Sequence, residues 1–328
     1  MKKLLNSNLR NPALIYIMIC TGLVGIFTSS MAQDSPWTRK ADMPTARLGL
    51  AAAVVNDNIY AIGGYPRANG QGMATNEVYD PSTDTWVIRA PMPTGRRWIS
   101  ACAVNGKIYV FGGYTNYGQP GLPTVEEYDP ATDTWTSKKP MPTPRLGPAS
   151  CVVDGIIYVI GGAISVAQGP LPTVEAYDPM KDTWIQKADM PTARMMLSAS
   201  AVNGKIYAIG GQYGKGRSYS KIEEYDPATD KWSEKADMLT ARGGHASCVV
   251  NGKIYAVAGA DVTNVISTLE EYDPATNTWT ERASIPTGRL GIAASVVNKK
   301  IYAIGGSVTA PPPHPGVRTV EEYDPIKD

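Results

Sequence analysis

The stretch VEEYDPATDTW, residues 125–135, decides the fold, because the chain returns to it or to a close variant along its whole length. Its Tyr-Asp pair recurs six times, beginning at Tyr79, Tyr128, Tyr177, Tyr225, Tyr272 and Tyr323. Its tryptophan recurs every 47–49 residues, at Trp37, Trp86, Trp135, Trp184, Trp232 and Trp279. A constant spacing in this range is typical of a repeat architecture, in which one unit cannot bury its apolar face alone and stacks on its neighbours.

Each repeat reads as four short strands, as residues 96–138 illustrate. The segments expected to be strands are 99–105, 107–111, 124–128 and 134–137. Asn105-Gly106 is a two-residue hairpin signal between the first two segments, and the Asp-Pro turn at 129–133 separates the last two. Four short antiparallel strands in about 50 residues predict the blade of a β-propeller.

The pattern resembles the kelch repeat, and the resemblance covers residues 35–328. It is carried by the Tyr-Asp pair, the tryptophan at kelch spacing and a Gly-Gly pair that begins at Gly63, Gly112, Gly161, Gly210 and Gly305. The fifth unit departs from the pattern with Ala258-Gly259. The resemblance implies a β-propeller but no single activity, since kelch propellers include oxidases, sugar mutarotases and protein-binding adaptors.

The two ends of the repeat region complete one another. The last unit stops at residues 323–328, before its tryptophan strand, whereas residues 35–40 form a tryptophan strand with no unit before it. We therefore predict an all-β, six-bladed propeller of four-stranded antiparallel blades, closed by the N-terminal strand. Residues 36–40 should pair beside residues 320–324, which removes the open edges of an incomplete ring.

The first 32 residues read as a secretory signal peptide, followed by the propeller at 33–328. The segment contains an apolar core at 14–27, the small-residue site Ser30-Met31-Ala32, and basic residues at Lys2, Lys3 and Arg10. The alternative is an uncleaved membrane anchor, because the uncharged span approaches the ~20 residues that a bilayer requires. The prediction is a cleaved, exported protein, periplasmic or extracellular.

Charge and cysteine usage exclude several classes of protein. Removing the three basic residues of the signal from the 31 in the chain leaves 28 basic against 30 acidic residues. The chain contains no basic stripe of the kind that indicates nucleic-acid binding. Cys102, Cys151 and Cys248 share one column of the repeat, which predicts small, buried and unpaired side chains. We expect a monomer without membrane contact beyond the signal segment.

The variable segments of all six repeats should emerge on one face of the ring. In a four-stranded meander, the link between the second and third strands lies on the same face as the link between blades. These variable segments include the loops at 65–75, 114–123 and 212–220, which contain Tyr65, Tyr114 and Tyr213. Variable loops on a rigid scaffold are where binding sites are usually built, so we place function on this loop-bearing face.

Every repeat carries an arginine shortly before its first strand, at Arg47, Arg96, Arg145, Arg194, Arg242 and Arg289. One interpretation is a cationic ring at the mouth of the central channel that captures an acidic group. The other is a structural pairing with the glutamate two residues before each Tyr-Asp, since buried charges require partners; these are Glu77, Glu126, Glu175, Glu223, Glu270 and Glu321. The Gly-Gly pair of the second strand leaves no side chain between the arginine and the glutamate. Blade five is the expected exception, because the methyl group of Ala258 replaces the first of these glycines.

Departures from the repeat are the sharper functional signal. Two residues after the arginine, four blades carry glycine, but the other two carry Trp98 and Met196. The positions on either side of this column include Arg97, Met195 and His245. We expect these five side chains at the channel mouth, where Trp98 would stack on a sugar or planar group while arginine holds an acid. The alternative is that they plug the channel or pack against the loops.

Catalytic motifs are few. His245 and His314 are the histidines of the chain, which excludes a His-rich metal site, and neither a phosphate loop nor a Gly-x-Ser-x-Gly elbow occurs. No cofactor is expected. The sequence predicts a binding module for a glycan or protein ligand. The resemblance also implies an alternative, a carbohydrate mutarotase or epimerase of the N-acetylneuraminate type, whose catalytic residues do not map onto this chain.

Overall fold

The computed structural model describes residues 35–67, 70–213, 217–261, 263–310 and 315–328. The predicted signal peptide and His314 lie outside these described residues. No helix in the described ranges has the length and apolar character that crossing a membrane requires.

The described chain forms six four-stranded antiparallel sheets and one small hairpin. The blades, in chain order, are β2 (Ala51–Val55), β3 (Asn58–Ile62), β4 (Asn76–Asp80) and β5 (Thr85–Ile88); β6 (Ser100–Val104), β7 (Lys107–Phe111), β8 (Val125–Asp129) and β9 (Thr134–Ser137); β10 (Ala149–Val153), β11 (Ile156–Ile160), β12 (Val174–Asp178) and β13 (Thr183–Lys187); β14 (Ser198–Val202), β15 (Lys205–Ile209), β18 (Ile222–Asp226) and β19 (Lys231–Glu234); β20 (Ala246–Val250), β21 (Lys253–Val257), β22 (Leu269–Asp273) and β23 (Thr278–Arg282); and β24 (Ala293–Val297), β25 (Lys300–Ile304), β26 (Val320–Tyr323) and β1 (Trp37–Arg39). The hairpin consists of β16 (Gln212–Tyr213) and β17 (Arg217–Ser218).

The core lies between the blades. The second strand of each blade is buried over its last four residues because neighbouring blades cover both of its faces. Ile62 and Val78 of the first blade, for example, share one apolar cluster with Ile108 and Tyr128 of the second. Within a blade, the repeat tyrosine pairs across the strands with the tryptophan, as Tyr128 does with Trp135 at 4.9 Å between ring centroids.

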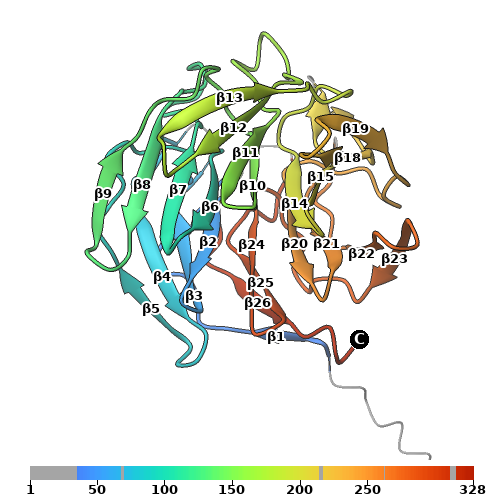
Figure 1. The fold of residues 1–328 in the computed structure, drawn as a ribbon. Helices are drawn as coiled ribbons and strands as arrows, with labels where there is room; N and C mark the ends of the chain where they lie inside the picture. Colours follow the sequence, from blue (N-terminus) through green and yellow to red (C-terminus); the bar gives the residue numbers. More distant parts are fainter. Residues whose placement is uncertain (1–34, 68–69, 214–216, 262, 311–314) are drawn as a thin grey trace, which may run out of the picture. The chain divides into compact units, whose positions relative to one another are not determined.

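The six first strands, β2, β6, β10, β14, β20 and β24, contact one another in sequence and surround the centre of the ring (Figure 1). The ring is closed as predicted, because β1 pairs with β26 in the register Trp37↔Tyr323, Thr38↔Glu322 and Arg39↔Glu321. Figure 1 shows the blue β1 beside the red β26. The Trp37 indole also donates to the Ala283 carbonyl oxygen of blade five at 2.7 Å, so the N-terminal strand joins two blades.

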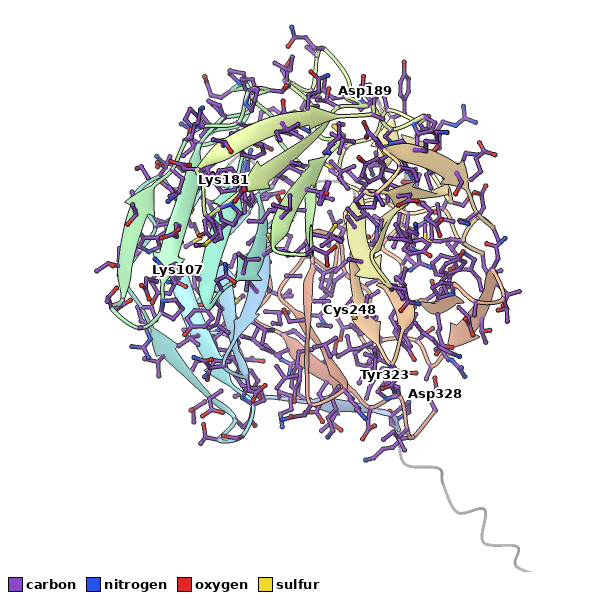
Figure 2. All side chains as sticks on the ribbon, in the orientation of Figure 1. Lys107, Lys181, Asp189, Cys248, Tyr323 and Asp328 are labelled. Carbon is purple, nitrogen blue, oxygen red and sulfur yellow. The ribbon has the colours of Figure 1, made fainter. Side chains whose placement is uncertain are left out.

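Side-chain placement agrees with the repeat pattern. The Tyr323 hydroxyl donates to the Asp328 carboxylate at 2.6 Å, and both residues lie beside the strand that closes the ring (Figure 2). The cysteines at 102, 151 and 248 are unpaired, as predicted. Cys248, labelled in Figure 2, lies on the inner strand β20.

Candidate functional site

The six repeat arginines form a structural layer at the loop-bearing face. In blade two, Arg96 donates to the Glu126 carboxylate at 2.7 Å and to the Gly112 and Thr124 carbonyl oxygens at 2.6 and 3.1 Å. Each guanidinium therefore ties the second strand to the third. The corresponding glutamates also pair with Arg47, Arg145, Arg194 and Arg289, at 2.6, 2.5, 2.8 and 2.7 Å, and with Arg242. The structural interpretation of the arginine column is confirmed.

The expected exception in blade five is wrong. Ala258 takes the left-handed conformation of the glycine it replaces (φ 56°), and its carbonyl oxygen still accepts from Arg242 at 2.9 Å. The Arg242–Glu270 ion pair forms. What changes is a neighbouring donor: the Leu239 amide donates to Glu270 at 2.9 Å, at a position where the other blades carry proline, which has no amide hydrogen.

None of these arginines is accessible in the structure, since each side chain is 0% exposed. Burial lowers the pKa of Arg47 and Arg289 to about 10, against the opposing attraction of their glutamates. Both groups therefore remain charged at neutral pH.

The residues that follow the arginines close the channel with a ring of hydrogen bonds. The amide of Gly49 donates to the Gly291 carbonyl oxygen at 2.8 Å, and the same bond runs from each blade to the next at 2.8–2.9 Å until the circle is complete. We call this set the channel ring; its members are Gly49, Trp98, Gly147, Met196, Gly244 and Gly291. Every member has a positive φ, between 50° and 62°.

Trp98 and Met196 occupy this ring at a cost. Their φ values are 50° and 53°, and the left-handed region costs a residue with a side chain roughly 1–2 kcal/mol. The Trp98 indole lies across the mouth: a Cβ atom placed on Gly244 or Gly291 would stand 3.4 Å from its Cη2 atom. Strained bulky residues that the scaffold does not require point to a functional role.

Beneath the channel ring lies a second layer of six side chains, five of them apolar. The layer consists of Leu50, Ile99, Pro148, Leu197, His245 and Ile292, and with the channel ring it lines a cavity of about 70 Å³. His245 forms a hydrogen bond with the Ser198 hydroxyl at 2.8 Å through Nε2, and its buried Nδ1 has no partner among the described residues. Burial, with the charges of Arg242 and Arg194, lowers the pKa of His245 to about 3, so the imidazole is neutral.

Arg97 is the most unusual buried group of this face. Its guanidinium carbon lies 4.2 Å from the ring centroid of Tyr65, 4.5 Å from that of Tyr114 and 5.9 Å from that of Tyr117. The side chain is 1% exposed, and its Nε has no hydrogen-bond partner among the described residues. Burial raises the pKa of Tyr65 to about 12 and also raises the pKa of Tyr114. The positive charge of Arg97 opposes both shifts.

The structure does not bring all the predicted site residues together. Trp98, Met196 and His245 line one cavity, Arg97 contacts Tyr65 and Tyr114, and Met195 packs in an apolar cluster with Tyr114. Tyr213 pairs with Arg217 in the β16–β17 hairpin and is largely exposed. Sequence reasoning missed Tyr117 and the channel ring itself, although the position two residues after each arginine, which is glycine in four of the six blades, was a usable signal for the ring.

Comparisons with known proteins agree with this architecture. The family described as the KLHDC2/KLHL20/DRC7 Kelch-repeats domain matches residues 49–234 and 185–306, and the Kelch motif family matches residues 288–328. A segment of 49 residues is 43% identical to an F-box/kelch-repeat protein of Arabidopsis thaliana, over 15% of this chain and 13% of that protein. The chain therefore matches only a small part of that relative's length.

A solved structure shares the fold of nearly the whole ring. The structure of YjhT resembles this one with a TM-score of 0.74 and 18% sequence identity, over 86% of this chain and 95% of that chain. At this identity the likeness concerns the fold. The match to the family over most of the blades, together with the six four-stranded sheets, leads to one conclusion: the chain belongs to the kelch-repeat family of β-propellers.

Proposed function

We propose that the protein is a binding module that engages a macromolecular partner, a protein or a glycan, through its loop-bearing face. The observation that carries this proposal is the distribution of exposed large apolar side chains. Half of the ten among the described residues lie on loops of this face: Tyr117, Val166, Tyr213, Leu239 and Val308. Exposed apolar and aromatic groups on variable loops are typical of an interaction surface.

The size of the cavity at the channel mouth supports a surface site over an enclosed one. Small-molecule sites usually enclose about 300–1,000 Å³, whereas the cavity lined by Trp98, Met196 and His245 measures about 70 Å³. The closed hydrogen bonds of the channel ring restrict deeper entry at this mouth. A ligand would therefore rest on the loops and on the Trp98 indole.

A pair of matched surface variants tests the proposal. The loop-face variant carries Tyr117→Ser, Val166→Ser and Tyr213→Ser; the control carries Val87→Ser, Met180→Ser and Ile185→Ser, at exposed apolar positions away from that face. Binding to a glycan array and to cross-linked partner proteins should be lost in the loop-face variant alone. Equal binding by both variants, or loss in the control alone, would contradict the proposal.

A second candidate is a carbohydrate mutarotase or epimerase of the N-acetylneuraminate type. It is favoured by the adjacency of the caged Arg97 and the Trp98 indole, a cation beside an aromatic surface of the kind that suits an acidic sugar. Anomer exchange of N-acetylneuraminate, followed by NMR, tests it. Faster exchange that Trp98→Gly abolishes would establish this activity, and exchange at the uncatalysed rate would eliminate it.

We also propose that the protein is exported, on the strength of the basic, apolar and small-residue segments within residues 1–32. Mass spectrometry of the protein recovered from cells should find a mature chain that begins at Gln33. Recovery of the uncleaved chain in the membrane fraction would instead support the anchor.

A further inference from the structure

We infer that Arg97 is a carboxylate-binding subsite, covered in this structure by a tyrosine cage of Tyr65, Tyr114 and Tyr117. The inference rests on the proposed function, because it specifies one chemical group that the ligand of the loop-bearing face carries. It is argued from the position of Arg97 in the repeat, its unused donor and its missing counter-charge.

The repeat does not require a cation at this position. The residues that follow the other five repeat arginines are Leu48, Leu146, Met195, Gly243 and Leu290. In every blade this residue forms the same backbone bridge to the residue after the Gly-Gly pair, or after Ala258-Gly259 in blade five, as Arg97 does to Tyr114. The backbone is therefore satisfied whichever side chain is present, and the bridges of the repeat do not require the guanidinium of blade two.

The surroundings of Arg97 attract a cation but leave a donor unused. Aromatic faces stabilise a guanidinium through their quadrupoles, and two tyrosine rings lie within 4.5 Å of its Cζ atom. Such faces offer no carboxylate or carbonyl oxygen. The Nε–H donor is buried without an acceptor among the described residues, and an unmet buried donor bears a desolvation penalty that an added acceptor would remove.

The charge of Arg97 is also uncompensated. Among the described residues, the ion pairs of fully buried arginines belong to the six repeat arginines, and none belongs to Arg97. The neighbouring phenols cannot replace a carboxylate, because burial raises the pKa of both Tyr65 and Tyr114. A buried, unpaired cation favours the arrival of an anion.

The shape of the donor selects the anion. A guanidinium presents its N–H groups in one plane, and a carboxylate accepts two of them side by side. Tyr65 and Tyr114 are nearly buried, whereas Tyr117 is 67% exposed. Tyr117 is therefore the ring that would move to admit a carboxylate, while Tyr65 and Tyr114 stay in place.

The test observes the arginine Nε–H signals of the ¹⁵N-labelled full chain by NMR. One set of probes is D-glucuronate against D-glucose, and the other is an acetylated tetrapeptide with a free against an amidated C-terminus. The Arg97 signal, assigned by its loss in Arg97→Leu, should shift saturably with the carboxylate of at least one set and with neither neutral counterpart. The signals of the six repeat arginines are internal controls and should not move.

Two further variants define the geometry. Arg97→Lys keeps the charge but loses the planar pair of donors, so carboxylate binding should weaken at least about tenfold. Arg217→Leu removes an exposed cation on β17 and should change nothing. The inference is overturned if the Arg97 signal ignores every carboxylate, or if Arg97→Leu binds the probes as tightly as the unaltered chain.

The two proposals fail separately. An unresponsive Arg97, combined with partner binding that the loop-face variant abolishes, would end the carboxylate subsite and leave the binding module intact. A responsive Arg97, combined with equal partner binding by both surface variants, would do the reverse. The probe set that shifts the signal identifies whether the carboxylate belongs to a sugar or to a peptide.

Discussion

Arg96 and Arg97 are consecutive residues with buried side chains, yet their surroundings have almost nothing in common. Arg96 donates to a glutamate and to two carbonyl oxygens. Arg97 contacts the rings of tyrosines and leaves its Nε without a partner among the described residues. The first environment occurs in all six blades. The contact with tyrosine rings in place of a glutamate occurs once among the described residues, although Arg47 and Arg194 also have an Nε without a partner there.

The difference shows how a repeat protein separates scaffold from site. A buried charge that each blade repeats is matched by an equally repeated counter-charge, because an unpaired buried charge would destabilise every blade. A buried charge found in one blade alone has no such partner. The comparison predicts that changes at the repeated positions affect stability and that changes at the departures affect binding.

The largest effect is expected at the paired arginine. Arg96→Met leaves Glu126 buried beside Thr94 without its cation, and loss of one member of a buried ion pair typically costs about 3–5 kcal/mol. Urea unfolding should show this loss. Adding Glu126→Gln should recover part of it, and a single variant within about 1 kcal/mol of the unaltered chain would contradict the scaffold role.

A smaller effect on stability is expected at His245, the polar side chain in the layer beneath the channel ring, and this effect depends on pH. The pKa of His245 is lowered to about 3 in the folded protein. As the pH falls through about 6.5, the imidazole therefore binds a proton in the unfolded chain but not in the folded chain. The contribution to stability is thus complete above that pH and is lost as the pH falls. Between pH 7 and pH 5 the loss amounts to about 2 kcal/mol.

The control for this prediction is His245→Leu, because Leu50 and Leu197 occupy the same layer in other blades. Unfolding free energies of the two proteins at pH 7 and pH 5 should diverge, with the variant losing less on acidification. Parallel pH profiles would show that His245 is already solvated or charged.

A still smaller effect is expected in the channel ring. Gly147→Ala places a methyl group at a φ of 58° and 3.3 Å from the Met196 amide nitrogen, which should cost about 1 kcal/mol. Trp98→Gly relieves the same kind of strain, which offsets the lost indole contacts, so its unfolding free energy should change by less than about 1 kcal/mol. A loss near the ~3–5 kcal/mol of a core tryptophan would place the indole in the scaffold.

The sequence predicted what is repeated more fully than what is unique. The blade count, the pairing of residues 36–40 with the last blade and the arginine–glutamate layer follow from residues that recur at fixed spacing, so each copy tests the others. The blade-five exception was wrong because the methyl group of Ala258, which adopts the left-handed conformation of the glycines in the other blades, does not block the Arg242–Glu270 ion pair.

The site was predicted only in part. Trp98, Met196 and His245 could be grouped because they share or adjoin a column that is mostly glycine. The cage around Arg97 could not, because Tyr117 belongs to a loop of unique sequence and its place beside Arg97 depends on how that loop folds. The hydrogen bonds of the channel ring join six distant residues and appear only when the ring is closed.

The most direct measurement of the central claim is the unfolding free energy of Arg97→Leu in urea, beside that of Arg96→Met. Leucine is the residue of three sister blades at this position, and replacing an uncompensated buried charge with an apolar group is often neutral or stabilising. The account predicts that Arg97→Leu is as stable as the unaltered chain or more so, and that it no longer responds to carboxylates. A loss of about 3 kcal/mol or more, equal to that of Arg96→Met, would mean that both arginines are scaffold.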